Sequence, residues 1–202
     1  DNNILKDIPK SDIIIAGPPC QGFSLTGPRN IDDPRNKLYL SVFKTLKLTN
    51  PKAFVVENVR GLKTMWEGNV FKEIIKKFES AGYVVTESLL NSADYGVPQI
   101  RHRVFIVGIK KELDKKFKFP KPEFDKDNYI TCGEAIDNLP SLENGELKSS
   151  NYNEKPTTNF QRYVMDSNKL YNHEATLHKQ FVKETIALVP EGGNYKNLPK
   201  GV

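Results

Sequence analysis

The chain has 202 residues, 38% hydrophobic and 27% charged, with a net charge of +5 at pH 7. These values indicate a globular domain with a sizeable core, and the sequence shows neither a membrane-length apolar run nor a signal-peptide pattern, which argues against a membrane protein. Two distant cysteines, Cys20 and Cys132, exclude a disulfide framework and fit a reducing cytosol, while the modest positive charge permits a nucleic-acid partner without requiring one.

The first half of the chain alternates strand and helix patterns. In chain order we expect a strand at 12–16, a helix at 37–48, a strand at 53–56, a helix at 69–80 closed by Gly82, and strands at 83–90 and 103–109. This order predicts an α/β fold with a doubly wound, Rossmann-like, mostly parallel sheet. The connection before the last strand is too short for a crossover helix, so we expect that strand to run antiparallel.

The second half of the chain differs from the first in composition and in its expected elements. It is expected to hold, in order, a segment rich in Lys, Pro and Phe (111–128), a short helix (131–139), a polar loop region (143–170) and a longer helix (174–188). We therefore divide the chain into residues 1–110 and 111–202. The first strand follows the start of the chain closely and no closing element precedes its end, so we expect the chain to be part of something larger.

Cys20 stands just after the first predicted strand, in the run Gly-Pro-Pro-Cys-Gln-Gly-Phe-Ser that spans 17–24. The Gly-Pro-Pro turn fixes an extended backbone, and ligands of open α/β sheets bind at the carboxyl ends of strands. A free cysteine is usually a small buried hydrophobe, but this one lies in a loop, off the apolar pattern. We therefore interpret Cys20 as a nucleophile.

Glu57-Asn58-Val59 follows the second predicted strand as Cys20 follows the first. Neighbouring parallel strands place their carboxyl ends side by side, so the thiol and the carboxyl group could share one pocket. In that position Glu57 could act as a proton donor. The alternative is that its charge only caps the next segment.

Arginines mark the start of the fourth predicted strand, in the run Gln-Ile-Arg-His-Arg at 99–103. The two-residue period of a strand places Gln99, Arg101 and Arg103 on one face. Neighbouring guanidinium groups repel unless acceptors lie nearby, and the arginine fork suits a base carbonyl or a phosphate. A stripe of surface salt bridges is the alternative, and we expect His102 to be structural.

The histidine pair His173 and His178 superficially resembles a zinc-binding helix. The two are separated by roughly 140° around a helix, so they would not face one metal ion. We expect no metal site.

The three motifs at 17–24, 57–59 and 99–103, in this order and at these separations, closely resemble those of the C5-cytosine DNA methyltransferases. The resemblance covers residues 1–110 well, and residues 172–193 more loosely resemble the segment that precedes the target-recognition region of these enzymes. It implies that residues 1–110 are part of an S-adenosylmethionine-dependent catalytic domain. Residues 111–202 would be a linker and the start of the target-recognition region.

The resemblance also implies a covalent mechanism. Cys20 would attack C6 of a cytosine flipped out of duplex DNA, which makes C5 nucleophilic towards the methyl group of S-adenosylmethionine. Glu57 would hold N3 and the exocyclic amine, Arg103 the O2 carbonyl, and Arg101 the Cys20 loop or a phosphate. Residues 21–37 would close behind the flipped base.

The same resemblance implies roles for further residues. For the cofactor, Pro19 would pack near S-adenosylmethionine, Leu38 would lie on its adenosine side, and Asp1 would meet the adenine. Residues assigned to substrate or DNA binding are Gln21, Ser24, Asn58 and Gln99.

Parts of the family pattern would lie outside the chain. The Gly-rich turn and the acidic ribose-binding strand would precede Asp1, and most of the recognition region and the closing asparagine motif would follow Val202. We therefore expect an excerpt, a truncated gene, or one subunit of a split enzyme that a complementary polypeptide completes. We expect this polypeptide to be inactive alone.

The function expected is that of a DNA cytosine-5 methyltransferase in a restriction–modification or genome-marking system of a prokaryotic cytoplasm, acting on double-stranded DNA and not at a membrane. A tRNA cytosine methyltransferase and a catalytically inactive module that binds DNA or a partner chain remain alternatives. The tail at 111–202 resembles the approach to a recognition insert, which favours DNA. A cysteine hydrolase is weaker, because no histidine stands at a suitable strand end.

Overall fold

The computed structural model describes residues 8–19, 37–146, 151–152, 154–167, 169–199 and 201. The chain forms two compact units that divide between Tyr129 and Ile130. None of the helices in the described ranges is both long and apolar enough to cross a membrane.

The first unit is built on a four-stranded sheet in the order β1-β2-β4-β3. Its elements are β1 (Ile13–Ala16), α1 (Tyr39–Thr49), β2 (Ala53–Val59), α2 (Gly61–Thr64), η4 (Met65–Gly68), α3 (Asn69–Ser80), β3 (Tyr83–Asn91), η5 (Ser92–Tyr95), β4 (His102–Lys110) and η6 (Lys111–Leu113). The expected helices and strands of residues 12–109 are confirmed with small shifts at their ends, and the largest is in β2, which continues three residues beyond the predicted end of its strand.

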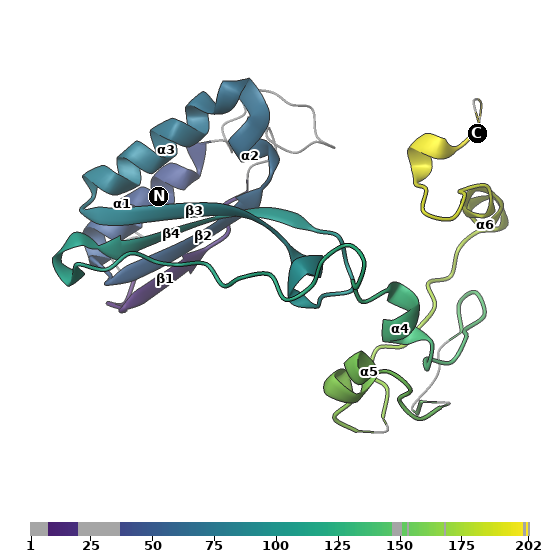
Figure 1. The fold of residues 1–202 in the computed structure, drawn as a ribbon. Coiled ribbons are helices and arrows are strands. Elements are labelled where there is room, and N and C mark those ends of the chain that lie inside the picture. Colours follow the sequence, from purple (N-terminus) through teal and green to yellow (C-terminus); the bar gives the residue numbers. More distant parts are fainter. Residues whose placement is uncertain are drawn as a thin grey trace. The chain divides into compact units, whose positions relative to one another are not determined.

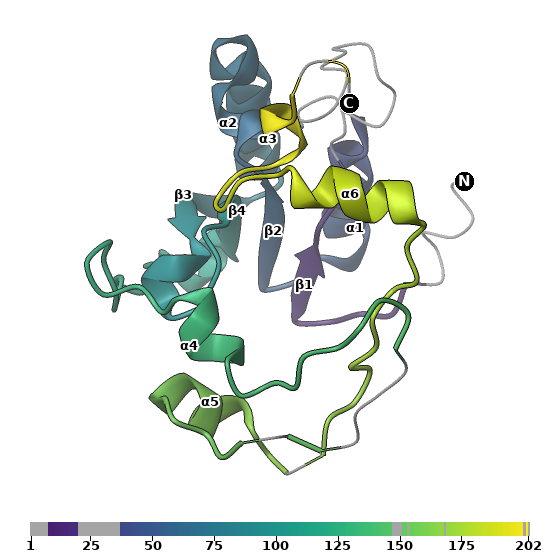
Figure 2. The same cartoon turned by 90° about the vertical axis from the view of Figure 1, so that its right-hand side faces the viewer.

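Strand directions confirm the α/β fold with an antiparallel strand. β1 and β2 are parallel and lie side by side in Figure 2. β4 lies between β2 and β3 and is antiparallel to both, so the other three strands all point the same way. The short connection over residues 92–101 leads β3 directly back into β4, which pairs with it as an antiparallel neighbour.

One face of the sheet carries the hydrophobic core, because α1 and α3 both cover that face (Figure 1). Side chains alternate along a strand, so Phe54 and Val56 of β2 point towards the helices, as do Val104 and Ile106 of β4. All four are at most 3% exposed. The intervening residues of β2 and β4 therefore belong to the opposite face.

Phe54 lies at the centre of this core. Its ring centroid is 4.8 Å from that of Phe78 and 5.0 Å from that of Tyr83. Gly108 is its register partner on β4, and a Cβ atom at that position would overlap the Phe54 ring. The Tyr83 hydroxyl donates a 2.8 Å hydrogen bond to the Pro51 carbonyl. Burial, with a smaller effect of the Glu112 carboxylate, raises the pKa of Tyr83 to about 12.

The second unit contains short helices, namely α4 (Cys132–Ile136), α5 (Asn159–Val164), α6 (Gln180–Ala187) and η7 (Tyr195–Asn197). The expected short helix at 131–139 is confirmed as α4. The prediction of loop throughout 143–170 is wrong for α5, which begins at a capping box between Thr158 and Gln161.

The last long helix begins at Gln180, later than the predicted residue 174. The residues before it are held by contacts to segment 140–146. The Nε2 atom of His173 lies 2.7 Å from the Pro140 carbonyl oxygen, and the amide of Ala175 donates to the Glu146 carbonyl. These long-range contacts stand in place of the helical hydrogen bonds that the pattern at 174–179 predicts.

Candidate functional site

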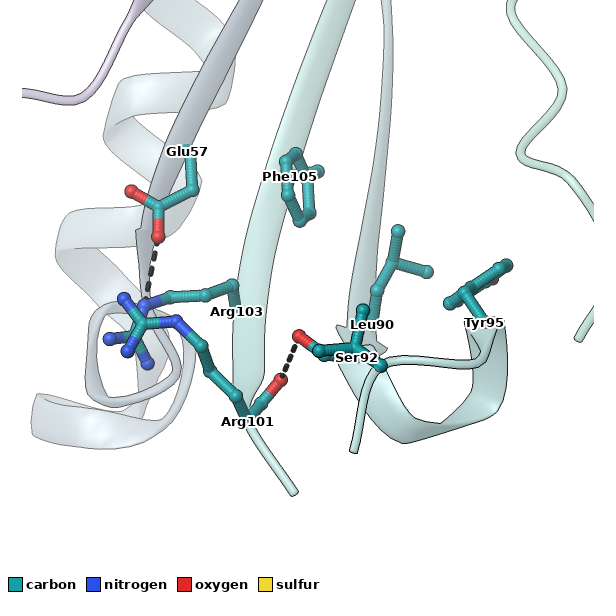
Figure 3. Close-up of a pocket in the computed structure, with 8 residues that line it drawn as sticks. Glu57, Leu90, Ser92, Tyr95, Arg101, Arg103 and Phe105 are labelled. Carbon is teal, nitrogen blue, oxygen red and sulfur yellow. Dashed lines mark hydrogen bonds and ion pairs between the residues drawn. The ribbon is translucent and has the colours of Figure 1, made fainter. Parts of the chain in front are cut away.

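A pocket of about 280 Å³ opens beside β2 and β4 on the sheet face opposite α1 and α3 (Figure 3). It combines charged groups with an apolar wall. The residues that line it are Glu57, Leu90, Ser92, Tyr95, Val97, Arg101, Arg103 and Phe105. Three of the predicted catalytic residues, Glu57, Arg101 and Arg103, are thus brought to one pocket.

Glu57 lies within β2, whereas the sequence pattern placed it after the strand. The backbone ladder with β4 continues to the end of β2, where Glu57 pairs with Phe105 and Val59 with Arg103. A carboxylate is accommodated inside the strand because this face of the sheet borders the pocket and not the core.

Glu57 and Arg103 form an ion pair across the two strands. The Arg103 Nε atom lies 2.8 Å from Glu57 Oε1, and the side chains are 24% and 37% exposed respectively. The Nη1 atom of Arg103 also donates to the His102 carbonyl at 2.9 Å. The pair therefore presents a carboxylate and a guanidinium group together at an accessible pocket wall.

The Gly-Pro-Pro turn that follows β1 lies beside the Glu57 carboxylate. A Cβ atom built on Gly17 would lie only 3.6 Å from Glu57 Oε2, so the first turn of the motif passes beside the carboxylate. The Nδ2 atom of Asn58 donates a 3.1 Å hydrogen bond to the Pro18 carbonyl, and the Asn58 side chain is buried. The structure thus tethers the segment that leads to Cys20 directly to the end of β2.

Arg101 stands just before β4, which begins at His102, and its side chain is exposed at the pocket. Gln99 lies in the same connection and is exposed, but it does not line the pocket. The sequence pattern predicted that Gln99, Arg101 and Arg103 share one face of the strand. Arg101 and Arg103 do line the same pocket, whereas Gln99 does not.

Four predicted site residues, Asp1, Cys20, Gln21 and Ser24, lie outside the described residues, as does almost all of the predicted closing loop 21–37. Two predicted cofactor residues are described. Pro19 is exposed after β1, and Leu38 is partly exposed immediately before α1. Both apolar side chains are accessible to a ligand.

The apolar wall of the pocket was not predicted. Phe105 could have been found, because it follows Arg103 by two residues and so shares its face of β4. Leu90 comes from β3, and Tyr95 and Val97 come from the β3–β4 connection, so their position depends on strand pairing. No group of three or more metal-ligating side chains occurs in the described part of the chain.

This arrangement suits a flat, polar heteroaromatic ring. Its edge could meet the carboxylate of Glu57 and the guanidinium group of Arg103, which together offer acceptors and donors. One face of such a ring could lie against the apolar wall formed by Phe105 and its neighbours.

Comparisons with known proteins identify the family of the chain. A family model described as C-5 cytosine-specific DNA methylase matches residues 1–198. The chain is 37% identical to the Type II methyltransferase M1.HphI of Haemophilus parahaemolyticus over 100% of the chain and 49% of that protein. It is 38% identical to the Type II methyltransferase M.DdeI of Desulfomicrobium norvegicum over 93% of the chain and 47% of that protein.

Among solved structures, the fold resembles an E. coli protein named as a DNA modification methyltransferase encoded within a prophage. The TM-score is 0.63 at 25% sequence identity, over 93% of this chain and 58% of that one. The chain spans about half the length, or less, of the curated relatives that it matches.

Proposed function

We propose, since the chain belongs to the C-5 cytosine-specific DNA methylase family, that it methylates C5 of a cytosine flipped out of duplex DNA. The observation that carries this proposal is the contact between Glu57 and Arg103 in a pocket beside the Gly17–Pro19 turn. It supplies the groups that the Watson–Crick edge of cytosine requires, next to the segment that leads to the proposed nucleophile.

Each protein group has a distinct part in the proposed reaction. Glu57 holds N3 and the exocyclic amine of the base, and Arg103 donates to O2. The guanidinium group of Arg101 orders the loop that carries Cys20 or meets a phosphate. Because Arg103 is paired with Glu57, the two side chains fix one another's orientation before the base arrives.

The covalent step begins when the Cys20 thiolate forms a bond from sulfur to C6 of the base. The C5–C6 π bond opens, Glu57, which takes up a proton as the base binds, passes that proton to N3, and C5 of the resulting enamine becomes nucleophilic. After C5 has accepted the methyl group, water takes the C5 proton and the electron pair of that C–H bond re-forms the C5–C6 double bond. The thiolate then leaves C6, and N3 returns its proton to Glu57. The product is 5-methylcytosine and the enzyme is regenerated.

We propose S-adenosylmethionine as the methyl donor, and its chemical contribution when bound is an electrophilic methyl group. The described residues fit such a ligand at the sheet edge beside β1, where Pro19 is exposed and Leu38 is partly exposed. Ligands of α/β sheets bind at this carboxyl edge. Asp1 stays a prediction for the adenine contact.

DNA contacts are proposed for Gln21, Ser24 and Gln99, of which Gln99 is exposed next to the pocket wall that Arg101 and Val97 form. Asn58 is buried and hydrogen-bonded to Pro18, so we propose that it serves substrate binding by holding the Cys20 segment in place. The relatives named above are Type II methyltransferases, and we propose the same restriction–modification role here, in the cytoplasm of a prokaryote.

The decisive experiment is covalent trapping by a duplex oligonucleotide that contains 5-fluorocytosine, in the presence of S-adenosylmethionine. Its fluorine replaces the C5 proton, so the enzyme cannot be released after methyl transfer. We expect the protein produced from its complete coding sequence to form a stable adduct that Cys20→Ser abolishes. Cys132→Ser is the matched control, because it removes the other thiol and should leave the adduct intact.

DNA binding without an adduct would overturn the proposed reaction and favour a non-catalytic binding module. An adduct with a tRNA substrate but not with duplex DNA would refute the proposed substrate.

A further inference from the structure

Arg101 stands at the end of the backbone ladder of the sheet. The last registered pair of β3 and β4 joins Asn91 to His102, one residue before Arg101 is reached. The backbone of Arg101 is held by the two consecutive residues Asn91 and Ser92. The Arg101 amide donates a 3.1 Å hydrogen bond to Asn91 Oδ1, and its carbonyl accepts one of 3.0 Å from the Ser92 amide.

The Asn91 side chain is 8% exposed, and the groups around it fix its orientation. Its Nδ2 atom donates to Asp94 Oδ1 at 3.0 Å and lies 3.2 Å from the Tyr129 hydroxyl. A carboxylate can only accept, so Asp94 selects the NH₂ side of the amide. The amide oxygen is therefore turned towards the Arg101 N–H.

Tyr129 completes this cluster from the segment that follows β4. Its hydroxyl donates to Asp94 Oδ1 at 2.5 Å, and this hydrogen bond raises the pKa of Tyr129, which keeps the donor protonated. The same segment is bound to η5 through its backbone, because the Asp94 carbonyl accepts from the amides of Glu123 and Phe124. Asp94 thus holds both Asn91 and the chain that leads into the second unit.

We propose that Asn91 is a positioning residue for Arg101, and that Asp94 and Tyr129 keep the Asn91 amide in the required orientation. The inference rests on the proposed function, in which Arg101 acts at the pocket. The flexible side chain of Arg101 begins from a backbone whose position the Asn91 amide defines. The cluster therefore determines where the guanidinium group can reach.

The test is a double-mutant cycle on kcat/KM for methyl transfer, with the protein produced from its complete coding sequence. We expect Asn91→Ala to lower kcat/KM roughly tenfold to a hundredfold, because small displacements of a catalytic group have effects of that size. In an Arg101→Ala background the same substitution should change kcat/KM less than about twofold, since the group it positions is gone.

Two further variants sharpen the result. Tyr129→Phe removes the hydroxyl that donates to Asp94 and should lower kcat/KM several-fold in the same direction. Asn128→Ala is the matched control, because it removes a hydrogen bond between the Asp125 amide and Asn128 Oδ1 in the same segment without contacting Asn91. It should leave kcat/KM unchanged.

The outcomes separate this inference from the proposed function. If the unaltered protein transfers no methyl group, or if Arg101→Ala leaves kcat/KM unchanged, the proposed function or the role it gives Arg101 fails. If Arg101→Ala is impaired but Asn91→Ala is silent, the positioning role is wrong. It is also wrong if the two effects multiply in the double variant, as two independent losses of stability or activity would.

Discussion

Replacement of Glu57 by glutamine should separate catalysis from stability. The amide keeps the shape of the side chain but removes the charge that pairs with Arg103 at 2.8 Å. Both partners are partly solvated, at 24% and 37% exposed, so the pair contributes only about 1 kcal/mol to the free energy of unfolding. For a unit of this size the unfolding midpoint should fall by about 3–6 °C.

The effect on methyl transfer should be much larger. Loss of a positioned proton donor costs roughly 10²–10⁴ in rate, which corresponds to about 3–5 kcal/mol of transition-state stabilisation. Thermal unfolding and single-turnover transfer of a labelled methyl group to duplex DNA measure the two effects separately. A folded Glu57→Gln protein with the wild-type rate would refute the proposed role of this carboxyl group.

Glu87→Gln provides the matched control. Glu87 pairs with Lys63 at 2.7 Å and has a similar exposure of 32%, but its position on β3 faces the helix-covered side of the sheet. Its loss should cost a similar amount of stability and leave the rate unchanged. An equal loss of rate in both variants would mean that Glu57 acts only through stability.

Three further predictions concern single residues of the first unit. Gly108→Ala should lower the free energy of unfolding by about 2–4 kcal/mol in urea titrations, because the new methyl group would overlap the Phe54 ring, and an unchanged midpoint would contradict this packing. The folded-state pKa of Tyr83 is raised to about 12, so the protonated hydroxyl stabilises the fold below pH 10. The difference in free energy of unfolding between the wild type and Tyr83→Phe should therefore shrink as the pH rises from about 10 to 12. A difference that stays constant over this range would argue against the raised pKa. Asn58→Ala should slow covalent trapping roughly tenfold by releasing Pro18 while the protein stays folded, and trapping at the wild-type rate would show that this hydrogen bond is dispensable.

Local patterns in the sequence predicted the longer helices and the strands of the first unit, and the short connection predicted the antiparallel direction of β4, but neither predicted the order of the strands in the sheet. The apolar spacing of α3 and the β-branched run of β1 are short-range signals, and both elements form where predicted. The insertion of β4 between β2 and β3 depends on contacts between distant residues, which no local pattern contains.

The features of the candidate site that the sequence did not predict also depend on contacts between distant residues. The prediction ended β2 at Val56 because the apolar run ends there, yet the ladder with β4 carries the strand past Glu57. The charged residues of the pocket were recognisable as motifs, while Leu90 belongs to an ordinary strand pattern and joins the site only through its partner Arg103. In the second unit, the start of α6 is delayed by contacts to residues far back in the chain.

Because β4 is antiparallel to β2, the contact between the two charged groups of the pocket depends on the register of these strands. Arg103 meets Glu57 only because the two strands pair as they do; a slip of one residue would carry the arginine to the helix-covered side, and a slip of two would displace it by about 7 Å along the strand. Substitutions far from the pocket that loosen this alignment, such as those at the Gly108 and Phe54 pair, should therefore abolish the proposed methyl transfer under conditions in which the protein is still folded.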